Sequence, residues 1–384
     1  MRGRVAEPQN ARSTRKPFYR PELDLLRFFA FSCVFLGHSE IREYLPRNTW
    51  KIQHAGNFGV CLFFFLSSYL ITELLIRERE KTDTVRLRDF YIRRTLRIWP
   101  LYFGFLGFCW LLSDFQPHMH ISRGRLLAFV LFVGNWYSSV HSWTFNPISP
   151  LWSISNEEQF YLIMPLVAKF GGRRAIAISS GIFLAVSYVT LFVLAKQGSN
   201  VDYTIWANSL VQFQFFAAGG LIALILRGSA PKLNQLRRVV MVGVGLLLWF
   251  VASGVFKIKL VRYGFYQQPW QICAGYAAVL AGTILIFFAF LGAGDKWTPQ
   301  WAVYLGKVSY GLYVFHVLAL DLFVEYWPFR AYFQNDSNFA VGAALTIVAP
   351  FLLTVALAAL SYEYFEKPFL RLKQRFTVVK SRPA

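Results

Sequence analysis

Three ionisable side chains share one face of the first long apolar segment. Asp24, Arg27 and His38 belong to the stretch 23–39, which is otherwise rich in Phe, Leu and Val. At about 100° per residue, the interval from Arg27 to His38 turns through roughly 1100°, which returns both side chains to the same helical face. Asp24 precedes Arg27 by one turn, where an ion pair is expected. Because an arginine in hydrocarbon costs about 3 kcal/mol or more, this face is predicted to line a polar, functional interior.

Two arginines and two carboxylates in later segments are further candidates for chemistry. Arg94 and Arg97 are three residues apart at the start of an apolar segment, so they share a helix face. Arginine binds phosphate through two parallel hydrogen bonds, and this pair is predicted to meet a ligand with several phosphates. The alternative is an anchor that contacts lipid phosphates. Glu157 and Glu158 are adjacent in an apolar context, so at most one of them faces the same cavity as His38.

A serine and three further histidines give weaker signals. Ser67 lies in a run of bulky residues, where it suits close helix packing, with ligand binding as the alternative. His316 is predicted at a membrane depth similar to that of His38, and its alternative role is a polar group with locally satisfied hydrogen bonds. His118 and His120 have no carboxylate or cysteine nearby, so no metal site is predicted.

The composition is that of a membrane protein that crosses the bilayer several times. Of the 384 residues, 55% are hydrophobic and 18% aromatic, and the mean hydropathy is positive. The four cysteines fall within apolar segments and are predicted to be buried hydrophobes. The apolar segments are residues 23–39, 57–76, 97–114, 123–140, 150–169, 174–196, 204–227, 238–256, 268–292, 302–324 and 338–365. The sequence therefore predicts an all-α, polytopic membrane helical bundle.

The net charge of +20 is concentrated in alternate loops. Lys and Arg gather in residues 1–22, 77–97 and 227–238 and in the C-terminal tail, which the positive-inside rule places in the cytoplasm; loop 256–268 is an exception. This distribution argues against nucleic-acid binding. It predicts a multi-pass protein of the plasma (inner) membrane with both termini in the cytoplasm.

Termini on the same side of the membrane require an even number of crossings, so one apolar segment does not span. The polar and proline-containing pair 123–140 and 150–169 is predicted to contain a broken or re-entrant element, which membranes tolerate where it lines a protein-enclosed cavity. About ten transmembrane helices are predicted. The chain is divided into a basic N-terminal arm at 1–20, a transmembrane domain at 21–370 and a basic tail at 371–384.

Five blocks of the sequence, taken in order, resemble the acyltransferase-3 family. They are Arg27 and His38 with Asp24, Gly59 to Tyr69, Arg94 and Arg97, Trp152 to Tyr161, and Gly306 to His316. Each block alone is weakly specific, but five in register over residues 20–375 are strongly specific. The chain departs from the family pattern at Cys61, Ser68 and Asn156, where the family has Asp, Gly and Val.

The resemblance implies an integral membrane enzyme that moves an acyl group from cytoplasmic acyl-CoA to a hydroxyl of a saccharide or lipid-linked glycan. Acetyl-CoA is the default donor, membrane lipids are the surrounding partners, and no metal is implied. His38 is expected to act as general base, Glu157 to orient it, and Arg27, held by Asp24, to contact the donor. The other residues expected to bind substrate are Arg94, Arg97, Ser67, Trp152, Tyr161, Ser309, Tyr310 and His316.

The competing interpretation is a transporter or flippase of a lipid-linked sugar, because a charged stripe inside a membrane also suits a substrate path. Release of CoA from labelled acyl-CoA distinguishes the two, since a transporter releases none. A haem protein would need paired histidines on facing helices, for which His38 and His316 are the candidate couple. The sequence leaves open the acceptor, the acyl group, the oligomeric state and the choice between direct transfer and an acyl-enzyme.

Overall fold

The computed structural model describes residues 19–39, 50–116, 119–141, 146–199, 201–258, 268–326 and 339–379. Residues 1–18 of the predicted arm, 380–384 of the predicted tail, and His118 lie outside these ranges. Within them every regular element is helical, which confirms the predicted all-α class.

Fourteen α-helices carry the fold of the described residues. They are α1 (Pro21–His38), α2 (Trp50–Gly56), α3 (Gly59–Thr82), α4 (Leu87–Leu112), α5 (Arg123–Val130), α6 (Gly134–His141), α7 (Trp152–Lys196), α8 (Ser209–Leu226), α9 (Gln235–Gly254), α10 (Pro269–Phe290), α11 (Gln300–Lys307), α12 (Ser309–Tyr326), α14 (Phe339–Leu360) and α15 (Lys367–Lys373). A π-helical turn, Ser361–Glu366, joins α14 to α15.

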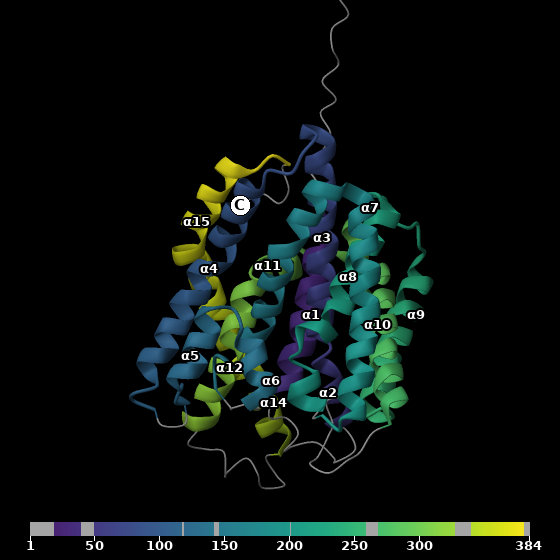
Figure 1. Cartoon of the computed structure of the whole chain (residues 1–384). Coiled ribbons are helices and arrows are strands. Elements are labelled where there is room, and N and C mark those ends of the chain that lie inside the picture. The colour runs from purple at the N-terminus through teal and green to yellow at the C-terminus, as the bar shows by residue number, and fades with distance from the viewer. Residues whose placement is uncertain are drawn as a thin grey trace, which may run out of the picture.

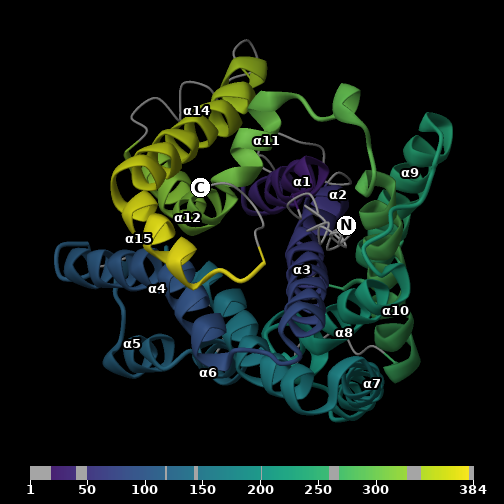
Figure 2. The same cartoon turned by 90° about the horizontal axis from the view of Figure 1, so that it is seen from above.

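The long helices run side by side along one axis (Figure 1), and α1 and α3 lie between two groups of them (Figure 2). On one side α8 packs on α3 and α7, and α9 packs on α10; on the other α12 packs on α14, and α15 packs on α4. The interior is largely aromatic, as in the stack of Phe64 and Phe160 on Phe216 at centroid distances of 4.7 and 4.5 Å. This arrangement places the polar face of α1 in the middle of the bundle.

The described helices are consistent with the predicted count of about ten membrane crossings. Seven helices are long and apolar enough to span, and α11 with α12, bent by 75°, adds an eighth. The helix α1 adds another, although it carries Glu22, Asp24 and Arg27 within its 18 residues. The tenth comes from α7, which consists of two arms. Tyr19 and Val379 line the same cavity, so both ends of the described chain lie on one side, as an even number requires.

The two arms of α7 fold back on each other at Gly172, which has the non-helical angles φ 59° and ψ −148°. Both arms contact the start of α8. Ser209 donates a hydrogen bond to Asn156 of the first arm at 2.6 Å, and Ser187 of the second arm donates to the carbonyl of Leu210 at 2.5 Å. The apolar segments 150–169 and 174–196 are therefore antiparallel spans.

Replacement of Gly172 by alanine is expected to destabilise the protein by about 1–3 kcal/mol. Its backbone conformation is essentially restricted to glycine, and an added Cβ would lie 3.0 Å from the guanidinium carbon of Arg79. Thermal unfolding in detergent measures the effect. Gly181→Ala is the matched control, because that position in the same helix has no atom within 4 Å of an added Cβ. Equal midpoints for the two variants would contradict a structural role for the turn.

The predicted segment 123–140 does not form one span. The short helices α5 and α6 are joined by a turn at Phe132, whose φ is +55°. The turn reaches into the bundle: Tyr102 donates to the carbonyl of Phe129 at 2.8 Å, and Gln159 donates to the carbonyl of Phe132 at 2.9 Å. Tyr102 and Gln159 thus supply hydrogen-bond donors to backbone carbonyls that would find no donor in lipid. The re-entrant element predicted for this region is thus α5 and α6.

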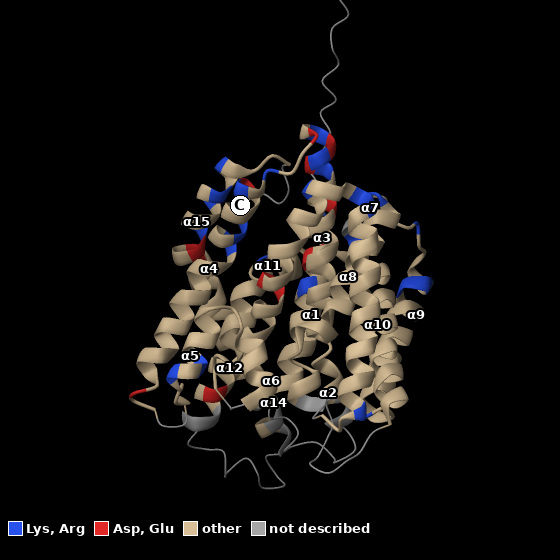
Figure 3. Cartoon of the chain, in the orientation of Figure 1, with Lys and Arg blue, Asp and Glu red and all other residues tan. Residues whose placement is uncertain are grey.

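Lys and Arg gather at one end of the bundle, formed by residues 77–97, 227–238 and 367–376 and called here the basic end (Figure 3). Some of these arginines cap helices. Arg238 donates to the carbonyls of Ala289 at 2.6 Å and Leu291 at 3.0 Å at the end of α10. Because the last carbonyls of a helix have no partner within it, such contacts stabilise the helix termini.

Candidate active site

The predicted pair of charges on α1 is present in the structure. The Nη1 of Arg27 lies 2.6 Å from Oδ1 of Asp24, and Tyr19 donates to Oδ2 at 3.0 Å. Asp24 is 1% exposed. The helix α11 crosses α1 here so closely that a Cβ on Gly306 would lie 1.8 Å from the carbonyl oxygen of Asp24. Because glycine has no side chain, Gly306 allows α11 to pack directly against the turn of α1 that carries the ion pair.

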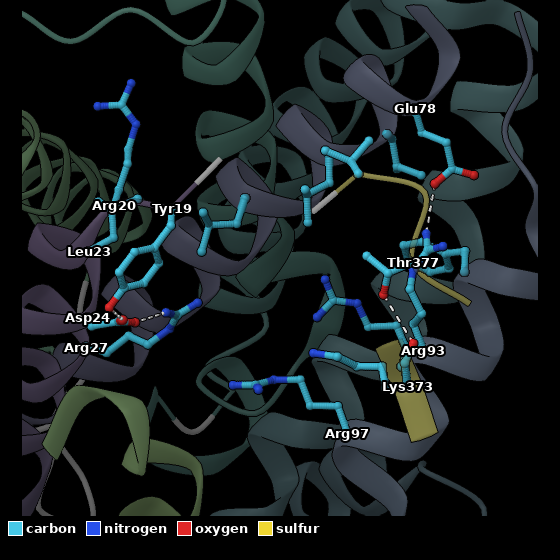
Figure 4. A pocket seen from close by; sticks show the side chains of 16 residues that line it. Tyr19, Arg20, Leu23, Asp24, Arg27, Glu78, Arg93, Arg97, Lys373 and Thr377 are labelled. Carbon is cyan, nitrogen blue, oxygen red and sulfur yellow. Dashed lines mark hydrogen bonds and ion pairs between the residues drawn. The ribbon is translucent and has the colours of Figure 1, made fainter. Parts of the chain in front are cut away.

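A cavity of about 140 Å³ opens at the basic end and is called here the arginine cavity. Its charged lining consists of Arg20, Asp24, Arg27, Glu78, Arg93, Arg94, Arg97 and Lys373. Arg27 of α1 and Arg97 of α4 approach it from opposite sides (Figure 4). With six cationic and two anionic side chains in the lining, the cavity is suited to a ligand with several negative charges.

The two carboxylates of the arginine cavity are already paired. Asp24 holds Arg27, and Glu78 lies 2.8 Å from Arg93. Arg94 stacks over the ring of Tyr161 at 5.0 Å. In the part of the chain that the structure describes, Arg97 forms neither an ion pair nor a hydrogen bond. Arg94 and Arg97 thus form no direct ion pair within the described residues, although Glu157 interacts with both electrostatically. Both are partly buried, so a bound anion would compensate the desolvation of their guanidinium groups.

A second cavity, of about 110 Å³, lies deeper in the bundle and is called here the inner cavity. Arg27, Arg94 and Arg97 line both cavities, so they form the junction between the two. The polar residues that line only the inner cavity are Ser67, Ser153, Glu157, Tyr161, Ser309, Tyr310 and Tyr313. Polar side chains therefore continue from the arginine cavity into the interior of the bundle.

Glu157 belongs to the wall of the inner cavity. Tyr161, one helical turn later, donates a hydrogen bond to Glu157 Oε2 at 2.6 Å, and Ser67 of α3 hydrogen-bonds the same tyrosine hydroxyl. Tyr310 donates to the carbonyl of Ile98 at 2.8 Å. These bonds fix the polar groups around the three arginines.

His38 and His316 form a pair beyond the inner cavity, toward the end opposite the basic end. Their ring centroids are 5.1 Å apart at an interplanar angle of 68°. His316 is fully buried, whereas His38 is exposed. Tyr313, which lines the inner cavity, lies one turn before His316, and their ring centroids are 5.4 Å apart. The two histidines thus lie beyond the inner cavity on α1 and α12.

The predicted contact between Glu157 and His38 is not the one the structure forms. Glu157 shares the inner cavity with Arg27, which precedes His38 on α1 by about 16 Å at 1.5 Å per residue. Its hydrogen-bond donor is Tyr161, and the ring next to His38 is His316. Trp152 packs between Phe64 and Trp206 in the aromatic interior. The chemical roles of Glu157 and Trp152 remain predictions.

Comparison with known families identifies the chain. A family model described as an acyltransferase domain, Acyl_transf_3, matches residues 20–363. The chain belongs to the acyltransferase-3 family. The five blocks that carry its resemblance to the acyltransferase-3 family lie on α1, α3, α4, α7 and α11–α12, and each contributes to the lining of the inner cavity.

Two bacterial proteins are among the relatives that match the chain over most of its length. A Bacillus subtilis (strain 168) protein named "Putative peptidoglycan O-acetyltransferase YrhL" is 26% identical over 370 residues, covering 91% of this chain and 55% of that protein. The O-acetyltransferase OatA of Staphylococcus aureus (strain NCTC 8325 / PS 47) is 27% identical over 378 residues, covering 92% and 57%. The chain thus spans a little over half the length of these relatives. No solved structure matches it.

Sequence reasoning missed a polar cluster that explains one departure from the acyltransferase-3 pattern. Asn156 accepts a hydrogen bond from Asn135 at 2.9 Å and one from Ser209 at 2.6 Å. Asn135 also donates to the carbonyl of Ala207 at 3.2 Å. The cluster ties the re-entrant α6 to α7 and α8. The polar residues Asn156 and Gln159, one turn apart in an apolar segment, were the available signal.

Proposed function

We propose that this chain is an integral membrane O-acyltransferase that moves an acyl group, with acetyl the simplest case, from acyl-CoA to a hydroxyl of a cell-envelope saccharide. The observation that supports this most strongly is the junction of the two cavities at Arg27, Arg94 and Arg97. A cationic entrance followed by a narrow polar interior suits a donor whose charged end stays outside and whose acyl end passes inward.

The basic end is the proposed cytoplasmic face of the plasma membrane, in accordance with the positive-inside rule. Acyl-CoA carries three phosphate groups, and guanidinium forks bind phosphate with two hydrogen bonds each. Arg94 and Arg97 would hold the nucleotide end, and Arg27, fixed by Asp24, would contact the phosphates or the amides of the pantetheine arm. The charge excess in the arginine cavity supports this assignment.

His38 is the proposed general base. Its Nδ1 lies 2.9 Å from the carbonyl oxygen of Val34, which can only accept, so Nδ1 carries a proton and Nε2 of the neutral ring has the lone pair. In the proposed step the acceptor hydroxyl gives its proton to Nε2 as its oxygen bonds the acyl carbon. The carbon–sulfur bond breaks, and the CoA thiolate takes the proton from His38. The exposed position of His38 lets an acceptor approach from the side opposite the donor.

The relatives suggest the acceptor class. The printed name of the Bacillus subtilis relative refers to peptidoglycan, and a glycan hydroxyl is a nucleophile that a neutral imidazole can activate. We therefore propose a saccharide of the cell envelope, presented at the face where His38 is exposed.

The test is an acyl-transfer assay with purified protein, acetyl-CoA labelled in the acetyl group and peptidoglycan fragments or lipid-linked glycans. We expect free CoA to be released and label to appear on the glycan, at rates that rise with glycan concentration. A folded protein that moves a lipid-linked sugar across vesicle membranes but releases no CoA would be a transporter, and the proposal would be wrong.

A further inference from the structure

We infer that residues 373–379, called here the C-terminal strap, form the outer wall of the donor site, and that Arg93 is the positioning residue that holds the strap there. The inference rests on the proposed function, because it takes acyl-CoA as the ligand of the arginine cavity. The strap contributes Lys373, Thr377 and Val379 to the lining of that cavity and no residue to the inner cavity. It therefore borders the part of the site that receives the charged end of the donor.

The strap crosses from α15 toward the end of α3. A short 3₁₀-helix, Gln374–Phe376, follows α15 directly, and Figure 2 shows the chain then running toward α3. Lys81 of α3 donates a hydrogen bond to the carbonyl of Val378 at 3.1 Å. Within the strap, the hydroxyl of Thr377 donates to the carbonyl of Lys373 at 3.1 Å. The strap is thus fixed to an element that is distant in the sequence, and it closes one side of the arginine cavity.

Arg93 joins the strap to α3 through two of its nitrogens. Nη1 donates to the carbonyl of Phe376 at 2.7 Å, and Nη2 donates to Oε2 of Glu78 at 2.8 Å. The other carboxylate oxygen of Glu78 accepts from the backbone N–H of Arg86 at 2.9 Å. The side chains of Arg93 and Glu78 are only 16% and 2% exposed. Because a guanidinium presents its donors in a rigid fork, Glu78 also fixes the direction in which Arg93 bonds the strap.

This bridge explains why a carboxylate lines a cavity that is suited to anions. A negative charge at Glu78 repels a polyphosphate ligand, so its presence there requires a compensating contribution. Both oxygens of Glu78 are bonded within the chain, so Glu78 acts on Arg93 rather than on a ligand. Arg93 is in turn bonded to Glu78 and to the strap, which leaves the arginines at the junction of the two cavities to contact the phosphates.

The lining beside the strap suits a nucleotide better than a bare polyphosphate, because it combines charged with apolar side chains. The apolar residues of the arginine cavity are Leu23, Leu70, Leu74, Leu75, Phe90 and Val379. A nucleotide likewise combines phosphates with a flat and largely apolar base. Ligand sites bury most of the surface of their ligand, so a displaced strap would expose the nucleotide to water and weaken its binding.

The test is calorimetric binding of CoA and of 3′,5′-ADP, which carries the base and two of the three phosphates of CoA, to the purified full chain and to Glu78→Gln. Electrostatics alone predicts tighter binding, because the substitution removes a negative charge from the cavity. The bridge predicts the reverse, because Arg93 loses its carboxylate and the strap loosens. We expect Kd to rise about tenfold for both ligands, the equivalent of one hydrogen bond to a charged group. The KM for acetyl-pantetheine, which has no nucleotide, should change little.

Glu80→Gln is the matched control. It removes a carboxylate from the same helix, but this side chain is 49% exposed and paired with Arg173, outside the arginine cavity. Both Kd values should stay within about twofold of those of the unmodified protein. Amide hydrogen exchange of residues 374–379 should become faster in Glu78→Gln and not in Glu80→Gln. Thermal unfolding in detergent shows whether each variant folds. If Glu78→Gln does not, Glu78→Asp keeps the charge but shortens the reach to Arg93, and it should weaken binding as well.

Tighter or unchanged binding of CoA by folded Glu78→Gln, or weaker binding without faster exchange in the strap, would overturn the inference. Unmodified protein that binds neither CoA nor 3′,5′-ADP would instead refute acyl-CoA as the donor, and the proposed function would fail with it. If the unmodified protein binds CoA while Glu78→Gln behaves like Glu80→Gln, only the role of Arg93 and the strap fails.

Discussion

Replacement of His38 by alanine is expected to lower acyl transfer to the acceptor by about 10²- to 10⁴-fold, the usual contribution of a positioned general base. The carbonyl of Val34 holds the imidazole at Nδ1, and the residue is exposed where an acceptor can approach. The measurement is the initial rate of label transfer from acetyl-CoA to the glycan at saturating donor. Because His38 lies far from the arginine cavity, the apparent affinity for acyl-CoA should change little.

Leu36→Ala is the matched control for this prediction, since Leu36 is 44% exposed on the same turn of α1 and should keep nearly full activity. His38→Ala with unimpaired transfer would refute the base assignment. Retained hydrolysis of acyl-CoA with lost transfer would restrict His38 to activation of the acceptor, which would leave the donor path as proposed.

The sequence predicts those parts of the site that depend on one helix. Asp24 and Arg27 are one turn apart, and their ion pair follows from helical periodicity alone. Arg94 and Arg97 share a face for the same reason, and both line the two cavities. The crossings were also predictable, because apolar length and charge asymmetry are properties of the chain itself.

Contacts between helices were not predictable from the sequence. Whether Glu157 meets Arg27 or His38 depends on the relative depth of α7 and α1, which is set by where α7 begins and how the helices pack. A shift of about two to three turns separates the two alternatives. The pairing of Asn135 with Asn156 likewise depends on the re-entrant turn at Phe132. Single-sequence patterns carry no information on such distant pairs.

Replacement of Arg97 by alanine is expected to raise the KM for acyl-CoA about 10- to 100-fold, with a smaller effect on kcat. Arg97 has no ion pair or hydrogen bond within the described residues, so its loss would break no direct contact of that kind, although Glu157 and Glu366 interact with it electrostatically. The variant would lose one or two charge-assisted hydrogen bonds to the phosphates of acyl-CoA, each worth about 1.5–3 kcal/mol. The effect should shrink at high ionic strength, because the arginine cavity opens to solvent.

Two further variants make the measurement specific. Arg88→Ala removes an exposed arginine from the start of the same helix, outside the lining of the arginine cavity, and should leave KM unchanged. Arg97→Lys keeps the charge but loses the planar fork, so its KM should lie between those of the parent and Arg97→Ala. If Arg97→Ala lowers kcat at constant KM, then Arg97 acts at the acyl centre and the polyphosphate end of the donor must bind elsewhere. Whether the effect of Arg97→Ala falls on KM or on kcat therefore tests whether the donor enters through the arginine cavity.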